Sequence, residues 1–280
     1  MIGLTNNISD LVTLRAMRMN RMALDRAMVR VATGKRINRG ADDPAGLIAS
    51  AQLDATLAAL DAESSANQRA INMADTADAA LGQVSDLLTQ AKSLAAANAN
   101  STGLSDDEKA ANQLEIDSIL QSVDRIASTT SFNGTKLLDG NASISASGES
   151  LKIDAAGTSD LGQITEGGTD YALSDLKTGE ALDTTGAKTS AAVSSIDVAI
   201  NQVATLRGKI GAFSKDTLQN RIDQISTSRE QMLTTVSQIR DTDYAAETSA
   251  SLRAEILEHA TMLLLGESHR TTKTLLDLLA

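Results

Sequence analysis

Apolar residues in the first forty positions fall on two sides of one predicted helix. At about 100° per residue, the first track holds Ile8, Leu11, Val12, Met19, Met22, Ala23 and Val29. The second track, on nearly the opposite side, holds Leu14, Met17, Leu24, Met28 and Val31. A surface helix of a globular domain has one apolar stripe, so a helix with two is expected to be buried between neighbours. We expect some of these neighbours to be other copies of the chain.

The first helix is predicted to end at Gly34, since glycine favours the position after a helix. The second is predicted to begin with Asp43 as its N-cap and Pro44 at its first position. No residue stops this helix before about residue 98, which gives a length of about 80 Å at 1.5 Å per residue. Its apolar track has the three- and four-residue steps of a coiled coil, at Ala74, Ala77, Leu81, Val84, Leu88, Ala91 and Ala95.

A third helix is predicted after residue 105, where Ser105 and Glu108 have the spacing of a capping box. It ends before Phe132, and the following Asn133-Gly134 dipeptide is a strong turn signal. Residues 140–190 change character and contain short alternating pieces, around Ile144 and Leu151, that predict hairpin strands.

The helical period returns near residue 190 and continues to the C-terminus. One run has a seven-residue repeat at Ile196, Val203 and Ile210, and the next repeats at Leu218, Ile225, Met232 and Ile239. The register shifts between residues 208 and 213, which indicates a stutter. The last segment is amphipathic, with apolar positions at Leu252, Ile256, Ala260, Leu263, Leu275, Leu276, Leu278 and Leu279.

These patterns predict a mainly α protein, an elongated antiparallel coiled coil or helical bundle with a small β-hairpin region and paired N- and C-termini. Aromatic residues make up only 1% of the chain, which suits thin coiled coils better than a large compact core. We expect three parts: a terminal coiled-coil domain (1–40 plus 240–280), a rod of long helices (41–139 plus 187–239), and a hairpin region with a variable surface (140–186).

Charge is unevenly distributed along the chain. The first 40 residues hold eight basic and two acidic residues, whereas the remainder holds 17 basic and 34 acidic residues. Residues 240–280 carry four basic and seven acidic residues, so the two ends have the complementary charges that paired helices often use. The alternative is a basic amphipathic helix that binds a membrane or nucleic acid. Residues 1–40 contain no aromatic anchor or stacking residue for either role.

The chain lacks the residues or the residue patterns that several kinds of chemistry require. The chain has no cysteine, which excludes disulfides and thiolate chemistry. The two histidines, His259 and His269, form no metal-binding motif, and the Asp42–Asp43 pair is better explained by helix capping than by a bound cation. We expect no enzyme activity, no metal and no cofactor. No run of 18 apolar residues is present, and the first residues lack the features of a signal peptide, so export is expected to proceed without a cleaved signal.

Three stretches carry a resemblance to a known family. They are GKRINRGADDPAGL (34–47), RIASTTSFNGTKLL (125–138) and IRDTDYAAETSASLRAEIL (239–257), followed by a leucine-rich tail. Their order and spacing resemble those of bacterial flagellin nearly from end to end. The segment at 140–190 stands where many flagellins have a large outer region, so the chain resembles a short member of the family.

The resemblance implies a structural subunit that polymerises into the extracellular flagellar filament for motility. Its implied partners are further copies of the chain and other flagellins, the flagellar export machinery, a flagellin chaperone, the filament cap and the hook-associated proteins. Nucleic acid and stable membrane insertion are not expected. A hook–filament junction protein, which shares the paired termini, is the alternative within the family. The residues expected to serve assembly are Ile8, Leu11, Leu14, Met19, Met22, Leu24, Val31, Gly34, Ile37, Asn38, Asp42, Asp43, Phe132, Asn133, Arg240, Asp241, Asp243, Leu263, Leu275 and Leu278.

Overall fold

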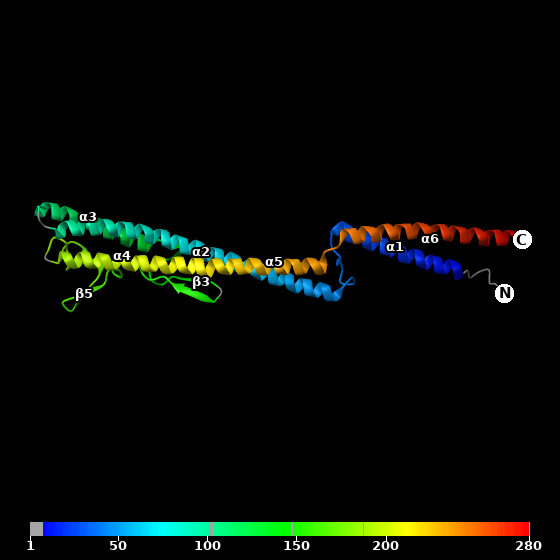
Figure 1. Cartoon of the computed structure of the whole chain (residues 1–280), viewed down its shortest axis with the longest axis horizontal. Coiled ribbons are helices and arrows are strands. Elements are labelled where there is room, and N and C mark those ends of the chain that lie inside the picture. The colour runs from blue at the N-terminus through cyan, green and yellow to red at the C-terminus, as the bar shows by residue number, and fades with distance from the viewer. Residues whose placement is uncertain (1–7, 101–102, 147, 187, 280) are drawn as a thin grey trace. The chain divides into compact units, whose positions relative to one another are not determined.

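The computed structural model describes residues 8–100, 103–146, 148–186 and 188–279, with the side chains of Ser9 and residues 271–279 excepted. Six α-helices follow one another along the chain (Figure 1). Their bounds are α1 Ile8–Thr33, α2 Pro44–Ala99, α3 Asp106–Thr129, α4 Thr189–Ala212, α5 Asn220–Arg240 and α6 Tyr244–Leu279. A 3-10 helix, η1, spans Leu173–Leu176, and a π-helix, η2, spans Phe213–Gln219 between α4 and α5.

The strands in the described segments pair as three small antiparallel hairpins. β1 (Ser131–Phe132) pairs with β2 (Thr135–Lys136), β3 (Ser143–Ala146) with β4 (Glu149–Lys152), and β5 (Ile164–Glu166) with β6 (Thr169–Tyr171). The mainly helical fold and the hairpin predicted around Ile144 and Leu151 are confirmed, and these two residues are direct cross-strand partners.

Internal contacts divide the chain into two units. Unit 1 contains residues 1–59 and 228–280, and unit 2 contains residues 60–227. This division lies within α2 and α5, whereas the sequence placed its boundaries at the turns near residues 40 and 240. The three-part division drawn from the sequence stays a prediction.

The core of unit 2 is built on small side chains. The predicted heptad track of α2 is buried along its whole length, and Leu81, Val84 and Leu88 are fully inaccessible. α3 and α4 cover this track with a row of branched residues each: Ile116, Ile119, Leu120 and Val123 from α3, and Ile196, Val203 and Ile210 from α4. Alanines make up much of the track on α2, and larger branched residues of α3 and α4 complete a core that forms almost without aromatic residues.

The local signals for helix ends act as the sequence predicts. The Ser105 hydroxyl accepts a hydrogen bond from the Glu108 N–H, while the Glu108 carboxylate accepts one from the Ser105 N–H at 2.8 Å. Asn133 and Gly134 both have positive φ, 49° and 81°, in the β1–β2 turn, which matches the mirror-image turn that suits a twisted hairpin. Phe132 packs against the core of unit 2.

The register shift lies at Phe213–Gln219, C-terminal to the predicted position at 208–213, and it is an inserted residue in a π-helix. Buried positions on α4 recur at seven-residue intervals as far as Ile210, but the next fully buried residue is Leu218, eight positions later. η2 accommodates this extra residue, since a π-helix widens the turn locally. The buried face then continues along α5 at Ile225.

A buried polar network joins α2, α3 and the segment before α4. The Gln113 amide donates to the Leu176 carbonyl at 2.6 Å, and its oxygen accepts from the backbone N–H of Thr184 at 2.9 Å and from the Thr184 hydroxyl. Asn98 donates to the same hydroxyl at 2.9 Å. Gln113 and Thr184 are each 1% exposed, so these bonds are shielded from water and fix the irregular segment against the helices.

We predict that Gln113→Ala lowers the free energy of unfolding by about 2–4 kcal/mol, because it leaves buried donors and an acceptor without partners. Urea unfolding followed by circular dichroism measures this change. Gln121→Ala is the matched control, because Gln121 lies on the exposed side of the same helix, and its effect should stay within about 0.5 kcal/mol. Equal effects of the two substitutions would show that the network does not stabilise the fold.

Candidate assembly site

α1 and α6 pair with one another in antiparallel orientation (Figure 1). At one end of the pair, Arg30 Nη1 lies 3.3 Å from Glu247 Oε1. At the other end, the Ser268 hydroxyl donates a hydrogen bond to Asp10, and His269 Nε2 lies 4.0 Å from the same carboxylate. The predicted pairing of the two chain ends is therefore confirmed.

The seam between α1 and α6 is unusually polar. Residues that face the partner recur at three- and four-residue steps, as in a coiled coil, and all are buried or half-buried. On α1 they are Asp10, Thr13, Met17, Asn20, Leu24, Ala27 and Val31, and on α6 they are Glu247, Ser251, Ala254, Glu258, Thr261, Leu265 and Ser268. Only Ala27 and Ala254 are fully buried in this seam, so it removes little large apolar surface from water.

Most of the large apolar side chains of this pair point outward instead. The first predicted track, Ile8, Leu11, Val12, Met19, Met22, Ala23 and Val29, is exposed over its whole length and is named here the outer face of α1. α6 exposes Leu252, Ile256, Leu257, Met262, Leu263 and Leu264. Of these, Leu263 is 77% exposed. Monomeric proteins rarely expose apolar patches of this extent, and such patches mark interaction surfaces.

The second predicted track behaves differently. Leu14, Met17, Leu24 and Val31 are half-buried against α6, whereas Met28 is 57% exposed. One stripe of the helix is thus covered within the chain, and the other is not. Leu275 and Leu278 belong to the part of α6 whose side chains lie outside the described residues.

Charge contributes less to the pairing than the sequence suggested. Arg15, Arg18, Arg21 and Arg26 are exposed, and no described carboxylate lies within 4 Å of them. Arg30 alone among the described basic residues of α1 forms an ion pair with α6. The complementary net charges of the two chain ends are therefore not matched residue by residue within one molecule.

Next to this pair, two connecting segments meet in an elbow, which comprises residues 34–43 between α1 and α2 and residues 240–243 between α5 and α6. The backbone N–H of Arg36 donates to the carbonyl of Arg240 at 2.7 Å, and the N–H of Thr242 donates to the carbonyl of Gly34 at 3.0 Å. Lys35 and Asp241 thereby form an isolated antiparallel bridge. Both connections satisfy part of their backbone hydrogen bonding with each other.

Side chains fix the shape of the elbow. Ile37 is 2% exposed and packs on Gly46, where a Cβ atom would lie 2.7 Å from Ile37 Cδ1. The Asn38 amide donates to the Lys35 carbonyl at 2.7 Å. The Asp42 carboxylate accepts the backbone N–H groups of Arg39 and Asn38 at 2.9 and 3.1 Å, and these hydrogen bonds lower its pKa below the ordinary value.

The helices that leave the elbow are capped by aspartates. Asp43 accepts the N–H of Gly46 at 2.9 Å directly before Pro44, as predicted. Asp243 accepts the N–H groups of Ala245 and Ala246 at 2.9 and 3.2 Å and so begins α6. Arg240 Nη1 lies 3.1 Å from Asp54 Oδ2 on α2.

Gly34 allows a close contact between the two segments. Its φ is +70°, and a Cβ at this position would lie 2.7 Å from the hydroxyl oxygen of Tyr244 at the start of α6. The positive φ of Gly34 was predictable from the sequence, since glycine favours the position after a helix. The close contact with Tyr244 was not, because Tyr244 is 210 residues away along the chain.

The structure thus brings Gly34, Ile37, Asn38, Asp42, Asp43, Arg240, Asp241 and Asp243 together in unit 1. Ile8, Leu11, Leu14, Met19, Met22, Leu24, Val31 and Leu263 lie along the α1–α6 pair of the same unit. Phe132 and Asn133 belong to unit 2. Sequence reasoning missed the polar seam and Arg36, whose guanidinium donates to the Ile239 carbonyl at 2.7 Å. A search for polar residues in the three- and four-residue rhythm would have found the seam.

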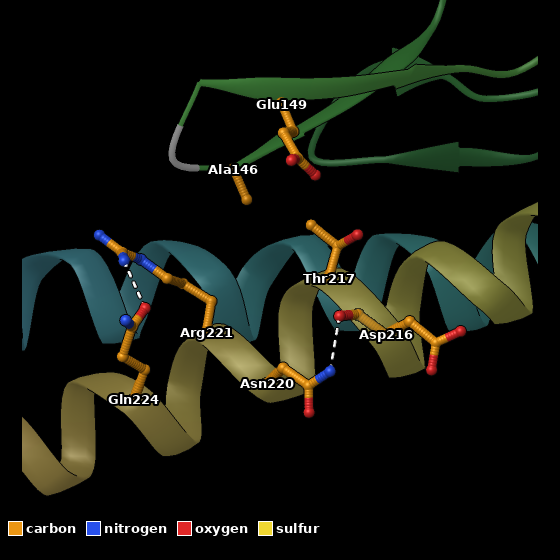
Figure 2. A pocket seen from close by; sticks show the side chains of 7 residues that line it. All are labelled: Ala146, Glu149, Asp216, Thr217, Asn220, Arg221 and Gln224. Carbon is orange, nitrogen blue, oxygen red and sulfur yellow. Dashed lines mark hydrogen bonds between the residues drawn. The ribbon is translucent and has the colours of Figure 1, made fainter.

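A polar cleft of about 530 Å³ separates the β3–β4 hairpin from η2 and α5 in unit 2 (Figure 2). Arg221 in this cleft is engaged by Glu63 at 2.8 Å and by Gln224 at 2.6 Å. None of its lining residues is a histidine, cysteine or lysine. In the described part of the chain, no three potential metal-ligating side chains gather, and no helix is long and apolar enough to cross a membrane.

Comparison with known proteins identifies what this arrangement belongs to. Residues 4–143 match the bacterial flagellin N-terminal helical region, and residues 193–279 match the bacterial flagellin C-terminal helical region. The chain belongs to the bacterial flagellin family. It is therefore a structural subunit of the flagellar filament, in the extracellular part of the flagellum.

Full-length relatives agree with this assignment. The chain is 31% identical to a flagellin of Listeria monocytogenes, with 98% of each chain covered, and 30% identical to a flagellin of Halalkalibacterium halodurans, with 99% of each covered. A putative flagellar hook-associated protein from Vibrio parahaemolyticus matches with a TM-score of 0.58 at 14% identity, over 71% of this chain and 100% of that one. At that identity the likeness shows a shared fold only, and the junction-protein alternative is not favoured.

We predict that Gly34→Ala loosens the elbow, since a left-handed alanine costs about 1–2 kcal/mol and the new methyl group meets the Tyr244 hydroxyl. Amide hydrogen exchange at Arg36 and Thr242 should speed up. In Gly34→Ala/Tyr244→Phe the steric part is relieved and the backbone part remains, so exchange should return only part of the way. Wild-type exchange rates in Gly34→Ala would contradict this account of the elbow.

We also predict that the elbow weakens in acid. A pKa lowered in the folded state means that the Asp42 carboxylate stabilises the elbow above about pH 4, the range of the unfolded group. This stabilisation is lost as the pH falls through the lowered pKa. Amide protection at Asn38 and Arg39 should therefore persist at neutral pH and decline below about pH 4. Asp42→Asn should abolish the pH dependence, whereas Asp25→Asn, on an exposed carboxylate of α1, should preserve it.

Proposed function

We propose that the chain polymerises by burying the outer face of α1 and the exposed apolar side of α6 against the same elements of neighbouring copies. The observation that carries this proposal is the inverted α1–α6 pair, with polar residues in its seam and large apolar residues outside it. Burial of one such side chain contributes about 1.5–3 kcal/mol. Heterologous contacts of this kind, repeated with a rotation that does not close, give open helical filaments.

Assembly and folding are coupled in this proposal. Ordering one backbone residue costs about 1–2 kcal/mol, and the polar seam supplies little apolar burial to offset it. The chain ends therefore become firmly ordered only when neighbours cover their outer faces. The chain ends of the monomer therefore stay flexible enough for export through the flagellar machinery.

The charge distribution supports close packing of unit 1 in a filament interior. Unit 1 holds 13 basic and 13 acidic residues and is formally neutral, whereas unit 2 holds 12 basic and 23 acidic residues, a formal charge of −11. Copies of a neutral unit can pack together without net repulsion. Unit 2 would then form the acidic exterior of the filament and keep it soluble.

The roles proposed for individual residues, and the partners, are those that the resemblance to flagellins implies. The elbow residues Gly34, Ile37, Asn38, Asp42, Asp43, Arg240, Asp241 and Asp243 hold the two connections in the shape that assembly requires, and Phe132 and Asn133 fix the hairpin that follows α3. The partners are further copies, other flagellins, the export machinery and a flagellin chaperone, the filament cap and the hook-associated proteins.

Leu11→Glu/Met19→Glu should remain a folded monomer but raise the critical concentration for polymerisation at least about a hundredfold, because two side chains worth about 1.5–3 kcal/mol each are lost from the contact. Sedimentation of filaments from seeded monomer measures this. Amide exchange across residues 14–31 should slow when the wild type is placed under polymerising conditions, and it should not slow for the double variant under the same conditions. Leu11→Met, which keeps volume and polarity, is the control and should polymerise normally. If the double variant polymerised at the same concentration as the wild type, the proposal would be wrong.

A further inference from the structure

Two arginines interrupt the apolar outer face of α1. At about 100° per residue, Arg15 and Arg26 lie within about 20° of Ile8, in the middle of that face. They are 11 residues apart, so their positions repeat along one line with a separation of about 16 Å. Both are exposed, and no carboxylate of the described residues lies within 4 Å of either. Arg18 and Arg21 lie at the edge of the face and beside it.

These arginines create a requirement for the assembled state. If the outer face of α1 is buried as proposed above, the two guanidinium groups lose water, and an unpaired buried charge is strongly destabilising. The described carboxylates of α1 do not remove this cost, because Asp10 lies in the seam with Ser268 and Asp25 lies off the outer face. The missing partners must come from another copy.

α6 presents an exposed carboxylate on the flank of its outward side. Glu255 is exposed and lies about 60° from Leu252 around the helix, between Leu252 and Met262 on the outward side. No basic group of the described residues lies within 4 Å of it. The three other carboxylates on the described part of α6 are less available, because Glu247 pairs with Arg30, Glu267 pairs with Arg270, and Glu258 is half-buried in the seam.

We infer that the outer face of α1 in one copy packs against the outward side of α6 in a neighbouring copy, where each Glu255 carboxylate is shared between the Arg15 and Arg26 groups of adjacent copies. This inference rests on the proposed polymerisation and specifies which surfaces meet. Contact between two α1 faces would place arginine against arginine. Contact between two α6 faces, which expose Arg253 as well as Glu255, would bring no carboxylate to the arginines of α1. The charges therefore favour the mixed contact over either symmetric one. A contact between two different surfaces is heterologous, as an open filament requires.

Charge reversal on each surface tests the inference. Arg15→Glu/Arg26→Glu places acidic groups on both surfaces, and Glu255→Lys places basic groups on both. Each variant alone should need at least about a tenfold higher concentration to polymerise than the wild type, the equivalent of about 1.4 kcal/mol. An equimolar mixture should polymerise within about threefold of the wild type, because each reversed surface then meets its complement in the other variant.

Arg18→Glu/Arg21→Glu is the matched control, since it makes the same change of charge on the same helix outside the centre of the outer face. Its critical concentration should stay within about threefold of the wild type. Circular dichroism and sedimentation velocity confirm that every variant is a helical monomer before polymerisation is induced.

Two results with the reversed variants would overturn the inference: either variant alone polymerises like the wild type, or their equimolar mixture fails to polymerise. Two results with the control would also overturn it: Arg18→Glu/Arg21→Glu rescues a reversed variant on mixing, or it has an equal defect itself. Each leaves the proposed polymerisation standing if Leu11→Glu/Met19→Glu still blocks assembly. Failure of that apolar test instead removes the proposed function itself, so the two are distinguishable.

Discussion

The pairing of α1 with α6 places many polar side chains inside and leaves most of the large apolar side chains outside, and the proposed assembly depends on this inversion. A soluble monomer normally hides its large apolar residues. Here Asn20, Thr13 and Thr261 lie in the seam, while Leu11, Met19 and Leu263 face water. A small rotation of the two helices cannot cover these residues, because the outer face of α1 lies on nearly the opposite side of the helix from the seam. In the proposed assembly, neighbouring copies cover them.

Unit 2, in contrast, buries its large apolar residues within the chain. Its heptad track on α2 is buried along its length, its polar network around Gln113 is satisfied, and its hairpins are closed by turns with the appropriate glycine and asparagine residues. It therefore has a core of its own, as an independently stable domain requires. The elbow in unit 1 lies between these two kinds of structure along the chain, and its hydrogen bonds join the segment after α1 to the segment before α6. Those bonds determine how the two exposed helices leave their connections.

The sequence predicted features that depend on local chemistry. The capping box at Ser105, the cap at Asp43 and the turn at Asn133 each need only residues close together in the chain, and all three are as expected. The heptad track from Ala74 to Ala95 was also readable, since periodicity alone identifies a buried face. The sequence did not reveal which of the two tracks on α1 the chain itself would cover, because both have helical spacing. It also missed the contact of Tyr244 with Gly34 and the contact of Gln113 with Thr184, since each joins residues distant in sequence.

The polar seam was missed for a different reason, which also bears on function. A search for helical periodicity scores apolar residues, and the seam is marked by Asp10, Thr13, Asn20 and their partners on α6, which score as surface. Natural coiled coils place a polar residue at an occasional seam position and accept a loss of stability in return for a defined partner or register. In the α1–α6 pair, polar residues occupy eight of the fourteen seam positions. A weak intramolecular pair that keeps its register can hold the two outer faces in place for a neighbour without competing for the apolar residues that bind that neighbour.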